Sequence, residues 1–200
     1  MKEAIEFLFG SKARWRLIKF FLLNDSKEFN LKEITQRNKL DNREVNTILN
    51  HFVKAKFLLS KAQKKTKKFI TNTEFTFYHE LKGLIVKSNV YPQCESLGKI
   101  KSLGDVKLGL ISGIFINFSK AKTDLLVVGD NISRAKMKHL LEDLEAEMGR
   151  EINYSLMTLA EFKYRTNMFD KFVTEVLEGP HEIVVNKVPN LIREIIGARK

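Results

Sequence analysis

Residues 31–72 carry two helical patterns followed by two strand patterns, and this order restricts the fold more than any other part of the chain. The second helical pattern begins at Asp41, whose side chain can cap a helix N-terminus, and Glu44 three residues later can complete a capping box. Apolar residues then recur at helical spacing and form one stripe: Val45, Ile48, Leu49, Phe52 and Val53. A shorter helical pattern at 31–37 precedes it, separated by turn residues 38–40. The segment therefore predicts a helix–turn–helix.

The face of the second helix opposite the apolar stripe is polar. It carries Asn42, Arg43, Asn46, Thr47 and Asn50. Arginine and asparagine are shaped to bind guanine and adenine edges in the major groove, and threonine can contact bases or phosphates. Asparagine and threonine are also common on solvated surfaces, which is the alternative interpretation. The elements that flank this helix favour DNA recognition.

Two strand patterns, 57–61 and 68–72, follow this helix and enclose a basic hairpin tip. Five lysines fall within eight residues: Lys61, Lys64, Lys65, Lys67 and Lys68. These charges repel one another unless they are solvated or matched by phosphates. Directly after a recognition helix, such a hairpin indicates a wing that contacts the DNA backbone and positions the protein without specifying the sequence. The order is that of a winged helix–turn–helix.

The charge of the chain is concentrated in its first half. Residues 1–91 hold 19 Lys and Arg against 9 Asp and Glu, a net charge of +10, whereas residues 92–200 hold 16 against 15, a net charge of +1. This asymmetry is expected when one domain meets a polyanion. The basic residues lack a lipid-seeking apolar face, so DNA is favoured over a membrane surface.

The composition bears on the compartment. No apolar run approaches the roughly 20 residues needed to span a bilayer, and the first residues lack a signal-peptide pattern. The single cysteine, Cys94, permits no intramolecular disulfide. We therefore expect a cytoplasmic protein.

We expect two domains in a mixed α+β and α/β chain, at residues 1–91 and 92–200. The first contains an apolar helix opened by Gly10 and Ser11, and an amphipathic helix at 75–87 that either forms a dimer interface or packs within the domain. The second alternates helix and strand patterns, as in a small α/β domain. Its expected helices are 93–102, 133–148, one after Thr158, 171–178 and 189–196, and its expected strands are 107–114, 124–128, 152–157 and 182–185.

Two short motifs of the second half lie about ten residues apart. They are Leu110-Ile111-Ser112-Gly113 and Thr123-Asp124-Leu125-Leu126-Val127. Over roughly residues 93–160 this arrangement resembles a minimal nucleotidyltransferase domain. In that family a Gly-Ser turn cradles the phosphates, and an Asp-x-Asp pair with a third carboxylate holds divalent metal ions. The resemblance implies a vestigial nucleotide site at Ser112, Gly113 and Asp124.

The sequence departs from this family at the residues that catalysis needs. The turn reads Ser112-Gly113 rather than Gly-Ser, and Lys122 stands where the first aspartate of the pair belongs. The strand pattern at 152–157 offers no carboxylate. One carboxylate, Asp124, cannot hold two metal ions, so we expect a catalytically inactive domain with no catalytic residue, cofactor or metal. The four histidines are scattered and have no ligand partners at suitable spacing.

The segment Leu8-Phe9-Gly10-Ser11-Lys12-Ala13-Arg14 opens the first helix. Together with the degenerate Ser-Gly and Asp-Leu-Leu-Val-Val-Gly-Asp module, it makes the whole chain similar to a set of prokaryotic winged helix–turn–helix transcriptional regulators. The resemblance implies DNA binding and transcriptional control. From the helix–turn–helix, the lysine hairpin and the one-sided charge, we expect a homodimeric, sequence-specific regulator of double-stranded DNA, in which Arg43, Asn46, Thr47 and Asn50 read bases. Its second domain would serve dimerisation or bind a protein or nucleotide. Two alternatives are an active nucleotidyltransferase and an antitoxin-like partner-binding protein, each targeted by the winged domain.

Overall fold

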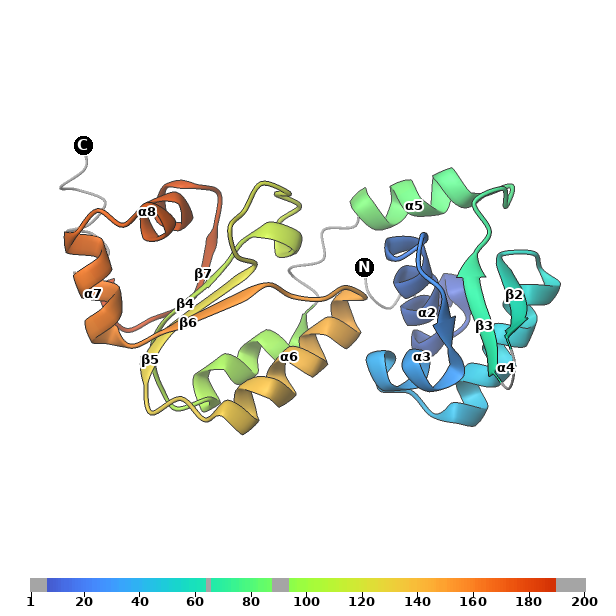
Figure 1. The fold of residues 1–200 in the computed structure, drawn as a ribbon, viewed down its shortest axis with the longest axis horizontal. Helices are drawn as coiled ribbons and strands as arrows, with labels where there is room; N and C mark the ends of the chain where they lie inside the picture. The colour runs from blue at the N-terminus through green and yellow to red at the C-terminus, as the bar shows by residue number, and fades with distance from the viewer. Residues whose placement is uncertain (1–6, 64–65, 88–93, 190–200) are drawn as a thin grey trace. The chain divides into compact units, whose positions relative to one another are not determined.

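The computed structural model describes residues 7–63, 66–87 and 94–189 (Figure 1). It is a mixed α/β structure with two separate sheets. The chain divides into two compact units. The first unit comprises Met1–Ser88 and Glu145–Glu151, and the second comprises Asn89–Leu144 and Ile152–Lys200. The domain boundary expected between residues 91 and 92 lies outside the described residues.

The first unit has the order helix–strand–helix–helix–strand–strand, followed by one more helix. Its elements are α2 (Lys12–Leu23), β1 (Phe29–Asn30), α3 (Leu31–Asn38), α4 (Asn42–Lys54), β2 (Leu58–Gln63), β3 (Thr66–Thr71) and α5 (Tyr78–Lys87). The strands form an antiparallel sheet in the order β1-β3-β2. The two helices and the hairpin expected over 31–72 are present. Strand β1 was not predicted, because two residues are too few to show a strand period.

Capping side chains and one apolar core fix the helices of this unit. Ser11 Oγ accepts a hydrogen bond from Arg14 N at 3.1 Å, which starts α2. Asp41 Oδ1 caps α4 by accepting from the backbone N–H groups of the second and third helical residues. Among the described residues the complete capping box lies at α3, between Asn30 and Glu33, and not at Asp41 and Glu44 as expected. The apolar stripe of α4 is buried except for Val53, which is half-buried.

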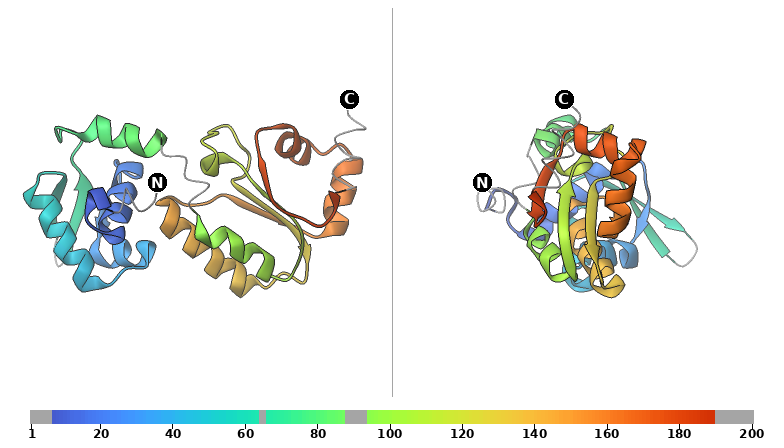
Figure 2. Two further views of the ribbon diagram at one scale, coloured as in Figure 1. Left: turned by 180° about the vertical axis from the view of Figure 1, so that it is seen from behind. Right: turned by 90° about the vertical axis from the view of Figure 1, so that its left-hand side faces the viewer.

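The second unit is a four-stranded mixed sheet with helices on both faces. Its elements are η2 (Glu95–Ser102), β4 (Asp105–Ile111), η3 (Gly113–Phe115), β5 (Leu125–Asp130), α6 (Arg134–Met148), β6 (Tyr154–Met157), α7 (Leu159–Asn167), α8 (Lys171–Glu178) and β7 (Glu182–Asn186). The last residues of α6, from Glu145 on, belong to the first unit. The strand order is β6-β5-β4-β7, in which β5 and β6 are parallel and the other pairs are antiparallel. Helices α7 and α8 cover one face, and η2 and α6 lie on the other (Figures 1 and 2).

Several expected boundaries differ from those observed. Within the segment expected as a helix at 93–102, η2 is a 3-10 helix that begins at Glu95. Strand β4 ends at Ile111 and not at 114, because Gly113 takes a positive φ of 54° and turns the chain away. Helix α5 begins at Tyr78, which is buried, while Phe77 is 60% exposed. The helix expected at 189–196 lies outside the described residues after position 189.

Candidate functional site

The outward face of α4 brings together the polar residues singled out in the sequence. Asn42, Arg43, Asn46, Thr47 and Asn50 are all exposed, because the apolar stripe on the other side of the helix is buried. Thr47 Oγ1 donates to Arg43 O at 3.0 Å, so this hydroxyl proton is used within the helix. The amide side chains of Asn42, Asn46 and Asn50 have no hydrogen-bond partner in the part of the chain that the structure describes. They are free to bind a ligand.

The β2–β3 hairpin presents the lysines of the predicted wing. Lys61 and Lys68 lie opposite each other across the two strands, and Ala62 lies opposite Lys67. The side chain of Lys67 lies over the ring of Phe69, with Nζ 5.3 Å from the ring centroid. Lys64 and Lys65, also predicted to contact DNA, lie outside the described residues.

Sequence reasoning missed the carboxylate that these lysines share. Glu28 precedes β1, and its Oε1 lies 3.3 Å from Lys61 Nζ while its Oε2 lies 3.9 Å from Lys68 Nζ. Like charges directly opposite each other destabilise a sheet, so Glu28 relieves the repulsion between the two lysines. The local sequence gives no signal for this contact, because it depends on the antiparallel pairing of β1 with β3.

A pocket of about 380 Å³ lies between the start of α2 and the first turns of α4. Its lining residues are Gly10, Ser11, Arg14, Arg43, Glu44, Thr47 and Ile48. Two of them, Arg43 and Thr47, also belong to the polar face of α4. Arg14 was not among the predicted site residues, because only the tertiary fold of the unit brings it beside the first turns of α4.

In the second unit, Ser112, Gly113 and Asp124 lie together at one turn. Asp124 Oδ1 accepts from Ile114 N, and Oδ2 accepts from Asn153 N, each at 2.8 Å. A Cβ at Gly113 would lie 1.9 Å from Asp124 Oδ1, so this position requires glycine. Both carboxylate oxygens are therefore used to hold the main chain of two segments.

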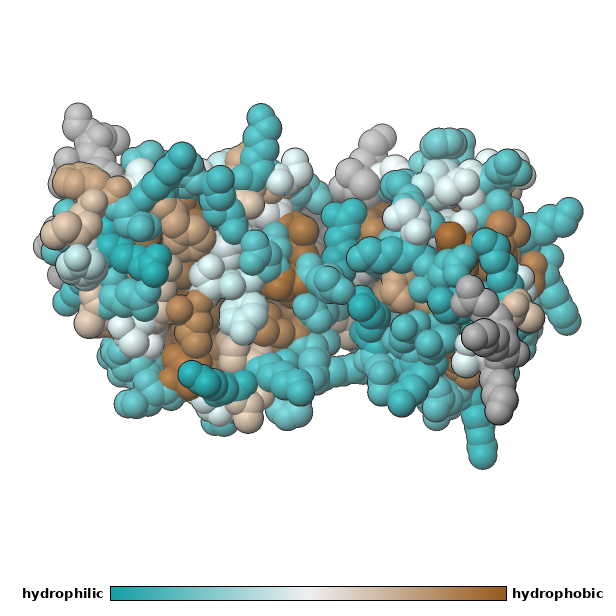
Figure 3. Space-filling view, viewed as in Figure 1, coloured by the Kyte–Doolittle hydropathy of each residue, from teal (hydrophilic) through white to brown (hydrophobic). Residues whose placement is uncertain are grey.

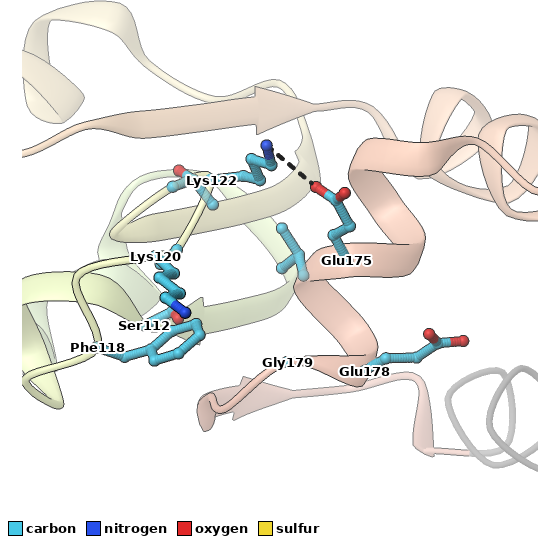
Figure 4. A pocket seen from close by; sticks show the side chains of 10 residues that line it. Ser112, Phe118, Lys120, Lys122, Glu175, Glu178 and Gly179 are labelled. Atoms are coloured by element: carbon cyan, nitrogen blue, oxygen red, sulfur yellow. Dashed lines mark ion pairs between the residues drawn. The ribbon is translucent and has the colours of Figure 1, made fainter.

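A cleft of about 460 Å³ opens beside this turn (Figure 4). Ser112 lies on one side of it with Lys120 and Lys122, which come from the loop before β5, and Glu175 and Glu178 of α8 lie on the other side. Lys122 Nζ is 3.5 Å from Glu175 Oε2. The residue at the position of the family's first aspartate is thus a cation that is paired with a carboxylate. Sequence reasoning did not identify Glu175, which comes from an element about fifty residues away.

One network of ionisable groups joins α5 to the end of α2. Tyr78 Oη and Lys82 Nζ both donate to Asp25 Oδ2, and Lys82 Nζ donates to Tyr78 Oη at 2.9 Å. The hydrogen bonds from Lys82 and Tyr78 hold the pKa of Asp25 below its usual value. The hydrogen bond to Asp25 raises the pKa of Lys82. This network stabilises the unit and does not lie on the α4 face.

The described residues carry no candidate metal centre: no three His, Cys, Asp or Glu side chains in them gather where they could hold an ion. The described helices also include none that is long and apolar enough to cross a membrane.

Comparison with known proteins gives little further information. No model of a protein family matches the chain, and no curated protein matches it either. Among solved structures, the chain is similar to TrmBL2, an archaeal chromatin protein whose structure is described as showing a novel mode of DNA binding. The similarity covers 90% of this chain and 79% of that chain at 14% sequence identity, with a TM-score of 0.29. We draw no conclusion about fold or function from a likeness of this size.

Proposed function

We propose that the chain binds double-stranded DNA through its first unit and acts as a sequence-specific transcriptional regulator. The observation that carries this proposal is the exposed polar face of α4, followed directly in the chain by a lysine-rich hairpin. The element order of the unit is that of a winged helix–turn–helix, in which the second helix of the pair enters the major groove. The net charge of +10 over residues 1–91 supplies the attraction to a polyanion.

In this proposal the asparagines of α4 read bases. Asn42, Asn46 and Asn50 follow one another at intervals of four residues, so they form a row along one side of the helix. At a rise of about 1.5 Å per residue they stand about 6 Å apart, which is close to two base-pair steps of about 3.4 Å each. Asparagine binds adenine through its N6 and N7 atoms. We therefore expect a binding site that contains adenines at alternating steps.

The hairpin lysines contact the DNA backbone in this proposal. Lys61, Lys67 and Lys68 are on the described strands, and Lys64 and Lys65 fall between them in the sequence. Each phosphate that a lysine neutralises adds about −0.9 to the slope of log K against log salt concentration. Hydrophilic side chains cover most of the visible face of the first unit, in keeping with a nucleic-acid-binding role (Figure 3).

The regulator acts as a homodimer in this proposal, and α5 supplies the contact with the second copy. Leu84 on this helix is 42% exposed, and Phe77, the residue immediately before the helix begins, is 60% exposed. Leu84 and the half-buried Leu81 lie three residues apart on one face of the helix, and Phe77 precedes Leu81 by four residues at the start of the same face. The second unit serves as a dimerisation, protein-binding or ligand-binding module.

The second unit is not a nucleotidyltransferase in this proposal. Asp124 is held by two backbone N–H donors, and Lys122 would repel a metal ion and already pairs with Glu175. Incubation of the full chain with radiolabelled nucleoside triphosphates, magnesium and DNA should leave all label in the nucleotide. Label transferred to DNA or protein, and lost in Asp124→Asn, would establish the enzyme instead.

DNA binding itself is tested by fluorescence anisotropy of a labelled random duplex titrated with the full chain at several salt concentrations. We expect affinity that falls steeply with salt, and a shallower slope when Lys67 and Lys68 are both changed to Gln. The matched control is a double change of Lys163 and Lys171 to Gln, which removes the same charge from exposed positions of α7 and α8. Absence of binding at low salt would contradict the proposal.

A further inference from the structure

The pocket between α2 and α4 presents two arginines from different helices to one space. Arg14 comes from the first turn of α2, and Arg43 comes from the first turn of α4. The guanidinium of Arg14 lies beside Gly10, since a Cβ at that position would be 3.5 Å from Arg14 Nη1. Gly10 has a positive φ of 82°, which an alanine adopts only with strain. The positive φ therefore favours glycine at this position, and a Cβ there would only contact Arg14 at an ordinary distance.

No described residue neutralises either guanidinium group. The side chains of Arg14 and Arg43 have no hydrogen-bond or ion-pair partner among the described residues. Ser11 lines the same pocket, and its Oγ accepts from Arg14 N, so its hydroxyl proton remains available for donation. Glu44 is the one acidic residue of the lining, so the pocket carries two positive charges against one negative. Its donors and net charge fit a singly charged oxyanion.

The pocket is continuous with the surface that faces DNA in the proposed function. Arg43 and Thr47 line the pocket and also belong to the polar face of α4. The DNA strand that borders the major groove around α4 therefore passes close to the pocket. Arginine guanidinium groups bind phosphate oxygens through two parallel hydrogen bonds, and both arginines line this pocket.

We infer that this pocket holds a single phosphate group of the DNA backbone between Arg14 and Arg43, an inference that rests on the proposed function. The two arginines fix the position of α4 along the groove, and the asparagines of the same helix read the bases. This role replaces the base-reading role that the sequence alone predicts for Arg43. Glu44 weakens the site, because its carboxylate repels the phosphate.

The two roles of Arg43 give different results in a binding experiment. Loss of a phosphate contact weakens binding to every sequence alike and reduces the salt slope by about 1, whereas loss of a base contact relaxes specificity at one position. The Arg14→Gln and Arg43→Gln variants of the full chain are each titrated with two duplexes at several salt concentrations. One is a duplex that the wild type has selected from a random library (the selected duplex), and the other is a random duplex. The matched control is Arg134→Gln, an exposed arginine of α6 without a partner among the described residues. A thermal melt of each variant verifies folding.

We expect Arg14→Gln and Arg43→Gln to reduce the salt slope by about 1 on both duplexes and to leave the ratio of the two affinities unchanged. Arg134→Gln should match the wild type. Glu44→Gln should bind both duplexes more tightly, because it removes the repelling charge. In a series of duplexes, one neutral methylphosphonate replaces a different backbone phosphate each time. At one position this replacement should weaken DNA binding by the wild type but not weaken binding by Arg14→Gln any further.

Three results would overturn the inference. If the wild type binds DNA and Arg14→Gln behaves like Arg134→Gln, the pocket is not a DNA contact although the proposed function stands. If Arg14→Gln or Arg43→Gln changes the affinity ratio, that arginine reads a base. Binding of inorganic phosphate can be monitored through the NMR signals of the arginine side chains. If phosphate saturates the pocket while Arg14→Gln leaves DNA binding intact, the site binds a free anion. Failure of the wild type to bind any duplex would instead contradict the proposed function itself.

Discussion

Asp124 shows how one carboxylate can hold a turn that resembles a nucleotide site. Its two oxygens accept from the backbone N–H groups of Ile114 and Asn153. In Asp124→Asn one of these donors faces an amide NH₂ and loses its acceptor. The hydrogen bond from Ile114 N is partly buried and the one from Asn153 N is exposed, so loss of one of them should lower the free energy of unfolding by about 0.5–1.5 kcal/mol. Urea denaturation measures it.

The control for this change is Asp105→Asn. Asp105 is exposed and pairs with Lys107 at the surface, so its loss should change stability little. Equal stability of the two variants would contradict a structural role for Asp124. If the wild type binds nucleotide in a metal-dependent manner and Asp124→Asn does not, the nucleotide site that the family resemblance implies would be supported instead.

Asp25 makes the stability of the first unit depend on pH. Hydrogen bonds from Lys82 and Tyr78 lower the pKa of Asp25 below 3.8 in the folded state. Its contribution is therefore complete above the unfolded-state pKa and is lost as the pH falls through the lower, folded-state pKa. The difference in unfolding free energy between the wild type and Asp25→Asn should be constant above about pH 5 and shrink below it. Urea denaturation at a series of pH values checks this, and a difference that does not vary with pH would refute it.

At the scale of elements, the hairpin and β1 are linked by Glu28. This carboxylate neutralises part of the charge of Lys61 and Lys68 in the free protein and competes with DNA phosphates for them. We expect Glu28→Gln to bind random duplexes up to about fivefold more tightly at low salt, since an exposed ion pair is worth at most about 1 kcal/mol. Anisotropy titrations measure the effect. Glu33→Gln, a neighbouring acid on α3, is the control, and equal affinity of the two variants would exclude the competition.

The row of asparagines on α4 makes a separate prediction about specificity. Asn46→Ala should reduce discrimination between the selected duplex and a duplex with one changed adenine by about 1–3 kcal/mol. Competition titrations with the two duplexes measure this difference. The matched control is Asn167→Ala, an exposed position at the end of α7. Discrimination unchanged by Asn46→Ala would remove this residue from the set that reads bases.

The elements that could be predicted from sequence are those that local chemistry determines. Helix α4 follows from the cap at Asp41 and from the stripe that begins at Val45, and both are local signals. The roles of Arg14 and Glu28 could not be predicted in this way, because each depends on a partner brought close by tertiary packing. The 3-10 geometry of η2 was also not predicted, since its apolar spacing fits an α-helix equally well.

The same distinction between local signals and tertiary packing applies to the candidate site. The exposed face of α4 could be predicted, because burial of one side of an amphipathic helix exposes the other. The structural use of Asp124 could not, because its partners Ile114 and Asn153 lie on different segments. The sequence pattern identified the turn at Ser112 and Gly113 but not the hydrogen bonds by which Asp124 holds the main chain there.

At the scale of the whole molecule, we expect a homodimer held in part by α5. Leu84→Glu places a charge on the exposed apolar face of this helix and should convert the dimer to a monomer. Light scattering of the full chain over a range of concentrations measures the mass. Leu59→Glu is the control, because Leu59 on β2 is exposed to a similar extent, 48% against 42% for Leu84. A wild type that is monomeric at all concentrations would contradict the prediction.

The central claim is that the chain recognises a particular DNA sequence, and selection from a random duplex library tests it most directly. The full-length protein is incubated with the library, and the retained duplexes are sequenced over several rounds. We predict an enriched inverted repeat whose half-sites contain adenines at alternating steps, with enrichment lost for Asn46→Ala. Retention of duplexes without any enriched sequence would contradict sequence-specific regulation and would leave only the electrostatic attraction of the basic hairpin.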